Sequence, residues 1–169
     1  MKRHLLTIAS VLLATAAGLG ADRSVKLDAD AAFARLKTLV GEWEGNTSMG
    51  KVRVSYDLVA GGTALVERES GEKMPAMLTV YYVDKGRLLL THYCIAGNQP
   101  RMQAQAFNGE TGELDFQFLD ATNLANPNAG HMHNAKIRVV DDKNMTSEWQ
   151  FYENGRQKFA ENSQYTRVR

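Results

Sequence analysis

The chain has 169 residues, a formal net charge of +1 and one cysteine. Acidic and basic residues are mixed along it, so the sequence offers no clustered basic face for a nucleic acid or an anionic membrane surface. A single cysteine cannot form an internal disulfide, so a packed core must stabilise the fold.

The first residues are typical of a secretory signal peptide. Basic residues at the N-terminus precede an apolar run that ends in small residues before Asp22. The run is shorter than the roughly 20 residues of a membrane-spanning helix, and no second apolar span follows it. We therefore predict a signal peptide over residues 1–21, cleaved between Ala16 and Ala21. Residues 22–169 then form a single periplasmic or secreted domain without membrane insertion.

Residues 28–40 predict one short helix. Asp28 and Asp30 are candidate N-caps, apolar residues recur on one face, and Gly41 can end the helix.

Beyond this helix the sequence consists of short alternating segments separated by turns. The turns contain Asn, Asp and Gly, which tolerate positive φ, and consecutive hairpins indicate an up-and-down meander. Ten strands without a long crossover close most simply into an antiparallel barrel, because closure removes the exposed edges. The predicted fold class is therefore all-β, with the helix at one end of a barrel. The predicted strands cover residues 41–47, 51–59, 63–70, 77–83, 87–94, 101–107, 113–119, 132–140, 145–152 and 156–167.

Alternation indicates which side chains face the interior of the barrel. Along residues 51–59, apolar and mostly charged residues alternate, as expected for a strand with one buried face. Extending the alternation of Ile137 and Val139 backward places His133 on the inward face, with His131 as a further candidate.

The only cysteine lies close to a histidine on one predicted strand. His92 and Cys94 are two residues apart, so they share one face. If His133 faces the same cavity, the three side chains supply an open zinc or copper site. Alternatively, an imidazole activates the Cys94 thiol as a nucleophile. The simpler interpretation, which we favour, is a buried cysteine and hydrogen-bonded histidines without metal or catalysis.

Amide side chains are frequent in two loops, residues 97–101 and 123–130. Pro100 fixes its own φ and stiffens the first loop. Asn98 and Arg101 are then expected at one mouth of the barrel, where they orient a polar ligand; the alternative is an ordinary surface loop.

Two pairs of glutamates occur at strand spacing. Glu42 with Glu44, and Glu67 with Glu69, are most simply solvated faces of strands. The facing of Glu67 stays open, because neither alternating set around it is clearly apolar. The scattered methionines are expected to fill the core.

The motif Gly41-Glu42-Trp43-Glu44-Gly45 after a short helix resembles the opening of lipocalin and calycin barrels. It is also similar to the start of the nitrobindin-type ten-stranded barrels. The lipocalin resemblance implies an arginine packed across Trp43, and Arg167 is the matching candidate, with Arg169 as second choice.

Three further segments extend the resemblance over nearly all of the mature chain. The glycine pair at residues 61–62, the segment HYCIAGNQPRM and the segment GHMH resemble an uncharacterised bacterial family of exported lipocalin-like proteins. This resemblance implies a fold and no established activity. The nitrobindin comparison implies haem on a histidine near the C-terminus, but no histidine follows His133, so that role has no matching residue here.

We therefore predict an exported β-barrel protein that binds a small, partly apolar molecule. We expect no cofactor, no nucleic-acid partner and no obvious protein partner. The alternatives are a metal- or thiol-dependent enzyme using His92, Cys94 and His133, haem binding on His92 or His133, and a barrel filled by its own side chains. The predicted ligand-binding residues are His92, Cys94, Asn98, Arg101, His131, His133 and Trp149.

Overall fold

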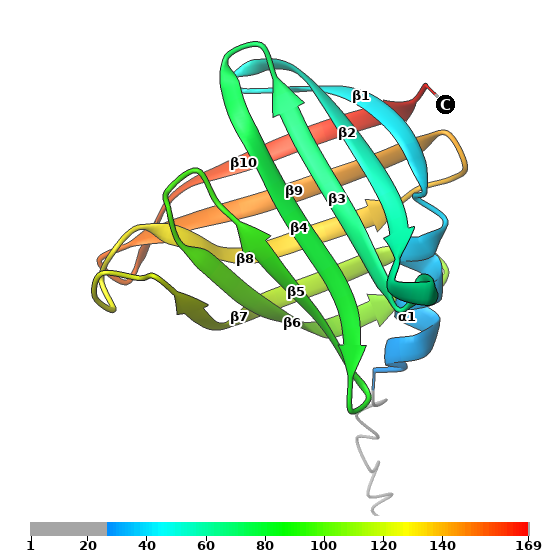
Figure 1. Ribbon diagram of the computed structural model, residues 1–169, viewed down its shortest axis with the longest axis horizontal. Helices are drawn as coiled ribbons and strands as arrows, with labels where there is room; N and C mark the ends of the chain where they lie inside the picture. Colours follow the sequence, from blue (N-terminus) through cyan, green and yellow to red (C-terminus); the bar gives the residue numbers. More distant parts are fainter. Residues whose placement is uncertain (1–26, 169) are drawn as a thin grey trace, which may run out of the picture.

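The computed structural model describes residues 27–168, and the predicted signal peptide and Arg169 lie outside them. Ten antiparallel strands form one closed barrel in which β1 pairs with both β2 and β10 (Figure 1). A 3-10 turn, Ala60–Gly62, separates β2 from β3. The elements are α1 (Ala29–Lys37), β1 (Gly41–Thr47), β2 (Gly50–Val59), β3 (Ala64–Gly71), β4 (Met74–Asp84), β5 (Arg87–Tyr93), β6 (Gln99–Asn108), β7 (Glu113–Thr122), β8 (His131–Val139), β9 (Asn144–Glu153) and β10 (Arg156–Arg167).

The predicted fold class is confirmed, and each predicted strand corresponds to an observed one. The helix begins as predicted, because the Asp28 carboxylate accepts a hydrogen bond from the Ala31 N–H at 3.0 Å. It ends earlier than predicted, at Lys37. The Leu39 carbonyl instead accepts the indole N–H of Trp43 at 2.8 Å, which directs the chain into β1.

The helix α1 covers one end of the barrel. Its buried face consists of Ala29, Ala32, Phe33 and Leu36, which join the barrel core. The turns that connect β1 to β2, β3 to β4, β5 to β6 and β9 to β10 lie at the opposite end (Figure 1). Within residues 27–168, no helix combines the length and the apolar character needed to cross a membrane.

The barrel interior near α1 is filled by the chain's own side chains. Inward-facing residues of most strands contribute to this core, and the Tyr81 and Phe116 rings meet edge to face at 6.0 Å. Its largest fully buried side chains are Trp43, Tyr81, Phe116, Leu36, Leu39 and Leu65. Side chains therefore fill the barrel interior near α1, and the free space lies toward the other end.

Arg167 closes the α1 end, as the resemblance to lipocalins implied. Its guanidinium lies 4.2 Å from the centroid of a Trp43 ring. The same guanidinium donates hydrogen bonds of 2.6 Å to the carbonyls of Thr38, Val40 and Asp142. One side chain thus joins β10 to the end of α1, the start of β1 and the turn before β9.

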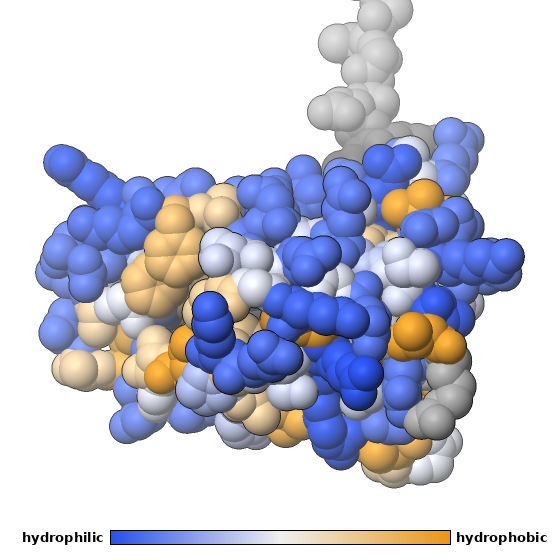
Figure 2. All heavy atoms as spheres, turned by 90° about the horizontal axis from the view of Figure 1, so that it is seen from above, coloured by the Kyte–Doolittle hydropathy of each residue, from blue (hydrophilic) through white to orange (hydrophobic). Residues whose placement is uncertain are grey.

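The surface seen in Figure 2 is mostly polar, and apolar side chains appear in several separate places on it. Phe159 and Met49 are exposed at the end away from α1, and Val59 and Val140 are exposed near α1. Phe159 and Met49 also line the cavity described below.

We predict that Arg167→Ala lowers the free energy of unfolding by about 1–3 kcal/mol, because it removes the cation over Trp43 and three charge-assisted hydrogen bonds. Urea unfolding followed by far-UV circular dichroism measures the loss. Arg156→Ala, at an exposed position of the same strand, is the matched control. Equal losses in the two variants would contradict the role given to Arg167.

Candidate ligand-binding pocket

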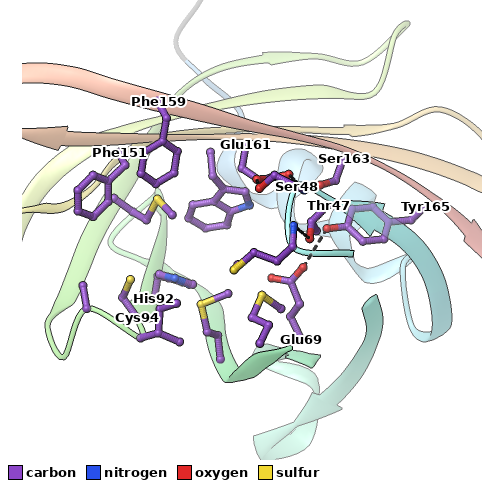
Figure 3. Close-up of a pocket in the computed structure, with 17 residues that line it drawn as sticks. Thr47, Ser48, Glu69, His92, Cys94, Phe151, Phe159, Glu161, Ser163 and Tyr165 are labelled. Carbon is purple, nitrogen blue, oxygen red and sulfur yellow. Dashed lines mark hydrogen bonds between the residues drawn. The ribbon is translucent and has the colours of Figure 1, made fainter. Parts of the chain in front are cut away.

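A cavity of about 360 Å³ opens at the barrel end opposite α1 (Figure 3). Residues from the turn between β1 and β2, from β3, β4, β5, β8, β9 and β10, and from the loop after β5 line it. Its walls are mostly apolar, as is usual for a small-molecule site. The apolar lining includes four methionines and three aromatic residues: Met49, Met74, Met77, Met132, Trp149, Phe151 and Phe159.

A row of polar side chains crosses the inner face of four neighbouring strands and ends at His92. The strand register pairs Tyr56 with Glu67, Glu67 with Thr79, and Thr79 with His92. The Thr79 hydroxyl donates to Glu67 Oε1 at 3.2 Å and lies 3.0 Å from His92 Nδ1. The Tyr81 hydroxyl donates to the other Glu67 oxygen at 2.6 Å. Glu67 is therefore on the inner face, which the sequence left open.

His92 presents a neutral imidazole to the cavity. Burial lowers its pKa to about 4, and its side chain lies 4.8 Å from Trp149, ring centre to ring centre. Because the Thr79 hydroxyl donates to Glu67, its oxygen accepts from His92 Nδ1–H, and Nε2 keeps the lone pair. Nε2 is buried without a hydrogen-bond partner in the described part of the chain. A hydrogen-bond acceptor is thus available in an apolar wall.

Glu69 is the second polar group of the cavity. Its Oε1 accepts a hydrogen bond from the Tyr165 hydroxyl at 3.1 Å, across the barrel from β10 to β3. Burial raises the pKa of Glu69 to about 7, and the nearby Glu67 adds to the increase. The hydrogen bond from Tyr165 offsets part of this shift, while Glu161 increases it further. The carboxyl group therefore changes its charge near neutral pH.

Gly45 leaves the space in which the Tyr165 ring packs against β1. The two residues pair across β1 and β10, and a Cβ on Gly45 would lie 2.5 Å from Tyr165 Cδ1 and 2.5 Å from the Gln164 carbonyl oxygen. Only a residue without a side chain allows this close approach. The second glycine of the Gly-x-Trp-x-Gly motif therefore positions the hydroxyl that bonds Glu69.

Cys94 lines the same cavity as His92, but β5 ends at Tyr93, so Cys94 lies in the following loop and not on the predicted strand. The thiol is partly buried. Burial raises its pKa, although backbone N–H groups of Ala96 and Ile95 offset part of the increase. A raised pKa disfavours the thiolate that a nucleophilic cysteine requires.

The prediction that His133 and His131 share the inward face with Ile137 is wrong. The ladder between β8 and β9 shifts register between Met132 and Asn134, and this bulge changes the phase of the alternation. Met132 lines the cavity instead. The two histidines line a separate surface groove.

The two histidines form a stack of rings in that groove. His131 Nε2 lies 3.0 Å from His133 Nδ1, and His131 Nδ1 lies 2.8 Å from the Ala129 carbonyl oxygen. His133 stacks between Phe118 and Tyr152, with ring centres 4.8 Å and 4.4 Å away. Both ring nitrogens of His131 and Nδ1 of His133 thus have partners within the protein.

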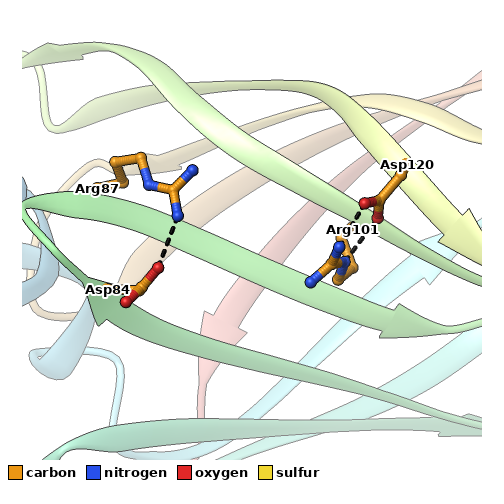
Figure 4. Close-up of polar contacts among 4 residues, drawn as sticks. All are labelled: Asp84, Arg87, Arg101 and Asp120. Atoms are coloured by element: carbon orange, nitrogen blue, oxygen red, sulfur yellow. Dashed lines mark hydrogen bonds and ion pairs between the residues drawn. The ribbon is translucent and has the colours of Figure 1, made fainter.

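Arg101 and Asn98 also lie outside the cavity lining, contrary to the expectation that they orient a ligand there. Arg101 pairs with Asp120 across β6 and β7, with Nε donating to Oδ1 at 2.6 Å (Figure 4). Asn98 is buried, and its amide donates to the Gly130 carbonyl at 2.8 Å. Arg101 therefore connects β6 to β7, and Asn98 connects the loop after β5 to the residue before β8.

The three-ligand metal site suggested by the sequence is not assembled. His133 lies in the separate groove, away from the cavity that His92 and Cys94 line. Over the part of the chain that the structure describes, no group of three His, Cys, Asp or Glu side chains is placed to hold a metal ion. Of the predicted ligand-binding residues, the cavity brings together His92, Cys94 and Trp149.

Sequence reasoning missed Glu69, Tyr165 and the methionines of the cavity. Leu65, Glu67 and Glu69 share one face of the strand, but Val66 of the opposite set is also buried, so the alternation did not indicate which face is inward. Tyr165 is 96 residues from its partner, and no spacing rule connects them.

The sequence matches no known family profile and no curated protein. Among solved structures, the chain is similar to a protein of unknown function from the DUF3598 family of Nostoc punctiforme, with a TM-score of 0.53 and 13% sequence identity. The similarity covers 79% of this chain and 49% of that chain, so this chain spans about half of its length. This similarity shows that the two proteins share a barrel fold, and it assigns no activity to this chain.

We predict that Glu69→Gln reduces the loss of stability as pH rises. The folded-state pKa of Glu69, about 7, exceeds the roughly 4.3 of an unfolded glutamate. Between these values the folded protein binds more protons, so the wild type loses stability as pH rises. Urea unfolding should show a gain for Glu69→Gln that is larger at pH 8 than at pH 5. Glu110→Gln, in an exposed turn, is the control, and parallel pH profiles for all three proteins would contradict the assignment.

We further predict that Gly45→Ala destabilises the protein by about 1–3 kcal/mol, because the new methyl group overlaps the Tyr165 ring and a backbone carbonyl. Thermal unfolding measures the change. Gly109→Ala is the matched control, since its Cβ would meet only the Phe107 ring at 3.9 Å. If the two variants unfold at the same temperature, Gly45 does not have this packing role.

Proposed function

We propose that this protein binds a small, largely apolar organic molecule in the cavity at the open end of the barrel. The observation that carries the proposal is the buried His92 Nε2, which has no hydrogen-bond partner in the described part of the chain and lies in an apolar wall. A buried polar atom without a partner is costly, and a bound molecule with a hydrogen-bond donor satisfies it. The cavity of about 360 Å³ is within the range for small ligands.

We also propose that the protein acts outside the cytoplasm as a lipocalin-like ligand-binding protein. The N-terminal sequence supports export, because basic residues precede an apolar run that ends in small residues. The Gly-x-Trp motif and the packing of Arg167 on Trp43 support the lipocalin-like affiliation. We expect no nucleic-acid partner, since the net charge is only +1.

The alternative of a thiol- or metal-dependent enzyme receives less support. Burial raises the pKa of the Cys94 thiol, and His133 lies in a different groove from His92. Haem does not fit the charges of the cavity either. Its propionates are anionic, whereas the described lining includes two glutamates and neither lysine nor arginine.

The proposal predicts saturable binding of a neutral apolar probe such as N-phenyl-1-naphthylamine. Because Trp149 lines the cavity, excitation energy absorbed by this tryptophan should be transferred to the bound probe. Cys94 is the only cysteine, so its reaction with N-ethylmaleimide, followed by mass spectrometry, should slow when the probe is bound.

Ala96→Trp should weaken probe binding at least about tenfold, because the indole obstructs the cavity mouth. Ala125→Trp places the same side chain in an exposed loop away from the cavity and should leave binding unchanged. Unsaturable binding by the wild type, or equal effects of the two variants, would refute the proposed site.

A further inference from the structure

We propose that the natural ligand of this cavity carries a protonated amine on an apolar body, and that Glu69 pairs with the ammonium group. This inference rests on the proposed function and specifies the chemical class of the ligand. It follows from the charges, acceptors and apolar surface that meet in the cavity.

The cavity contains acidic groups without a basic counterpart. Among the described residues that line it, Glu69 and Glu161 are acidic, and none is lysine or arginine. An anionic ligand such as a fatty acid would place its carboxylate beside these groups with no cation to pair it. A cationic ligand instead relieves the repulsion between the carboxylates.

The two glutamates are not equivalent. Glu161 is already bound to the turn between β1 and β2, because Ser48 donates its backbone N–H at 2.7 Å and its hydroxyl. Among residues 27–168, Glu69 accepts a hydrogen bond only from the Tyr165 hydroxyl, through Oε1. Its side chain points into the cavity, on the wall facing Ser163 and Tyr165 (Figure 3). Glu69 therefore has an oxygen available to a ligand.

The uncharged groups of the cavity also suit an amine. His92 Nε2 is a buried acceptor, and an ammonium group or a second N–H or O–H of the ligand can donate to it. Trp149, Phe151 and Phe159 provide ring faces that attract a cation, and the methionines adapt to an apolar body. The acceptors and the apolar walls thus fit one amphiphilic cation.

Side chains from several strands surround Glu69. Glu67 precedes it on the same inner face, Tyr165 and Glu161 approach from β10, and its neighbours on β2 and β4 are Val54 and Met77. None of these groups is a cation. A bound ammonium favours the ionised form of Glu69, so binding near neutral pH should release a proton.

Isothermal titration calorimetry of the full mature protein with octylamine, 1-octanol and octanoate at pH 8 tests the proposal. Octylamine should bind at least about tenfold more tightly than octanol, and octanoate should bind most weakly. At pH 7, the octylamine heats measured in phosphate and in Tris should differ by the ionisation heat of the released proton.

Glu69→Gln should weaken octylamine binding about tenfold or more, abolish the buffer dependence and leave octanol binding within about twofold. Glu110→Gln, which removes the same charge from an exposed turn, should behave as the wild type. If octanol or octanoate binds as tightly as octylamine, the amine specificity is overturned while the proposed function stands. If none of the three compounds binds, the proposed function fails and the specificity with it.

Discussion

Closure of β1 against β10 is the constraint on which the rest of the structure depends. Once the first and last strands pair, every strand has two neighbours, and alternate side chains are committed to one interior. Arg167 secures this closure because it contacts Trp43 and three carbonyls at the end where the strands meet α1. The Gly-x-Trp-x-Gly motif contributes twice, through Trp43 at the closed end and through Gly45 beneath Tyr165.

The interior of the closed barrel is apolar near α1 and more polar toward the other end. Near α1 the inward side chains are large and apolar, so they fill the space. Toward the other end the inner face carries Glu67, Thr79 and His92 in one row and Glu69 with Tyr165 in the next. Carboxylates and an imidazole are expensive to bury, and hydrogen bonds from Thr79, Tyr81 and Tyr165 offset only part of that cost. A core optimised for stability alone would contain hydrophobic residues here.

Most of the fold could be predicted from local sequence signals, but the site only in part. Turn residues and period-two alternation define the strands, because each depends on residues close in the chain. The facing of His133 could not be derived, since a single bulge between Met132 and Asn134 reverses the alternation. The contact between Glu69 and Tyr165 depends on barrel closure, which brings distant strands together. His92 and Cys94 do line one cavity, although Cys94 reaches it from the loop after β5 and not from the strand itself.

Burial of Glu69 without a cation explains why the charge of this cavity is informative about its ligand. If the carboxyl group had only a structural role, a glutamine could accept the hydrogen bond from the Tyr165 hydroxyl equally well. A glutamine would also avoid the cost of burying an ionised carboxylate. The protein instead keeps a group whose pKa lies at about 7, so the charge of the cavity depends on what enters it. A neutral guest leaves Glu69 free to remain protonated. A cationic guest gains an ion pair in an environment of low polarity, where its strength is greatest.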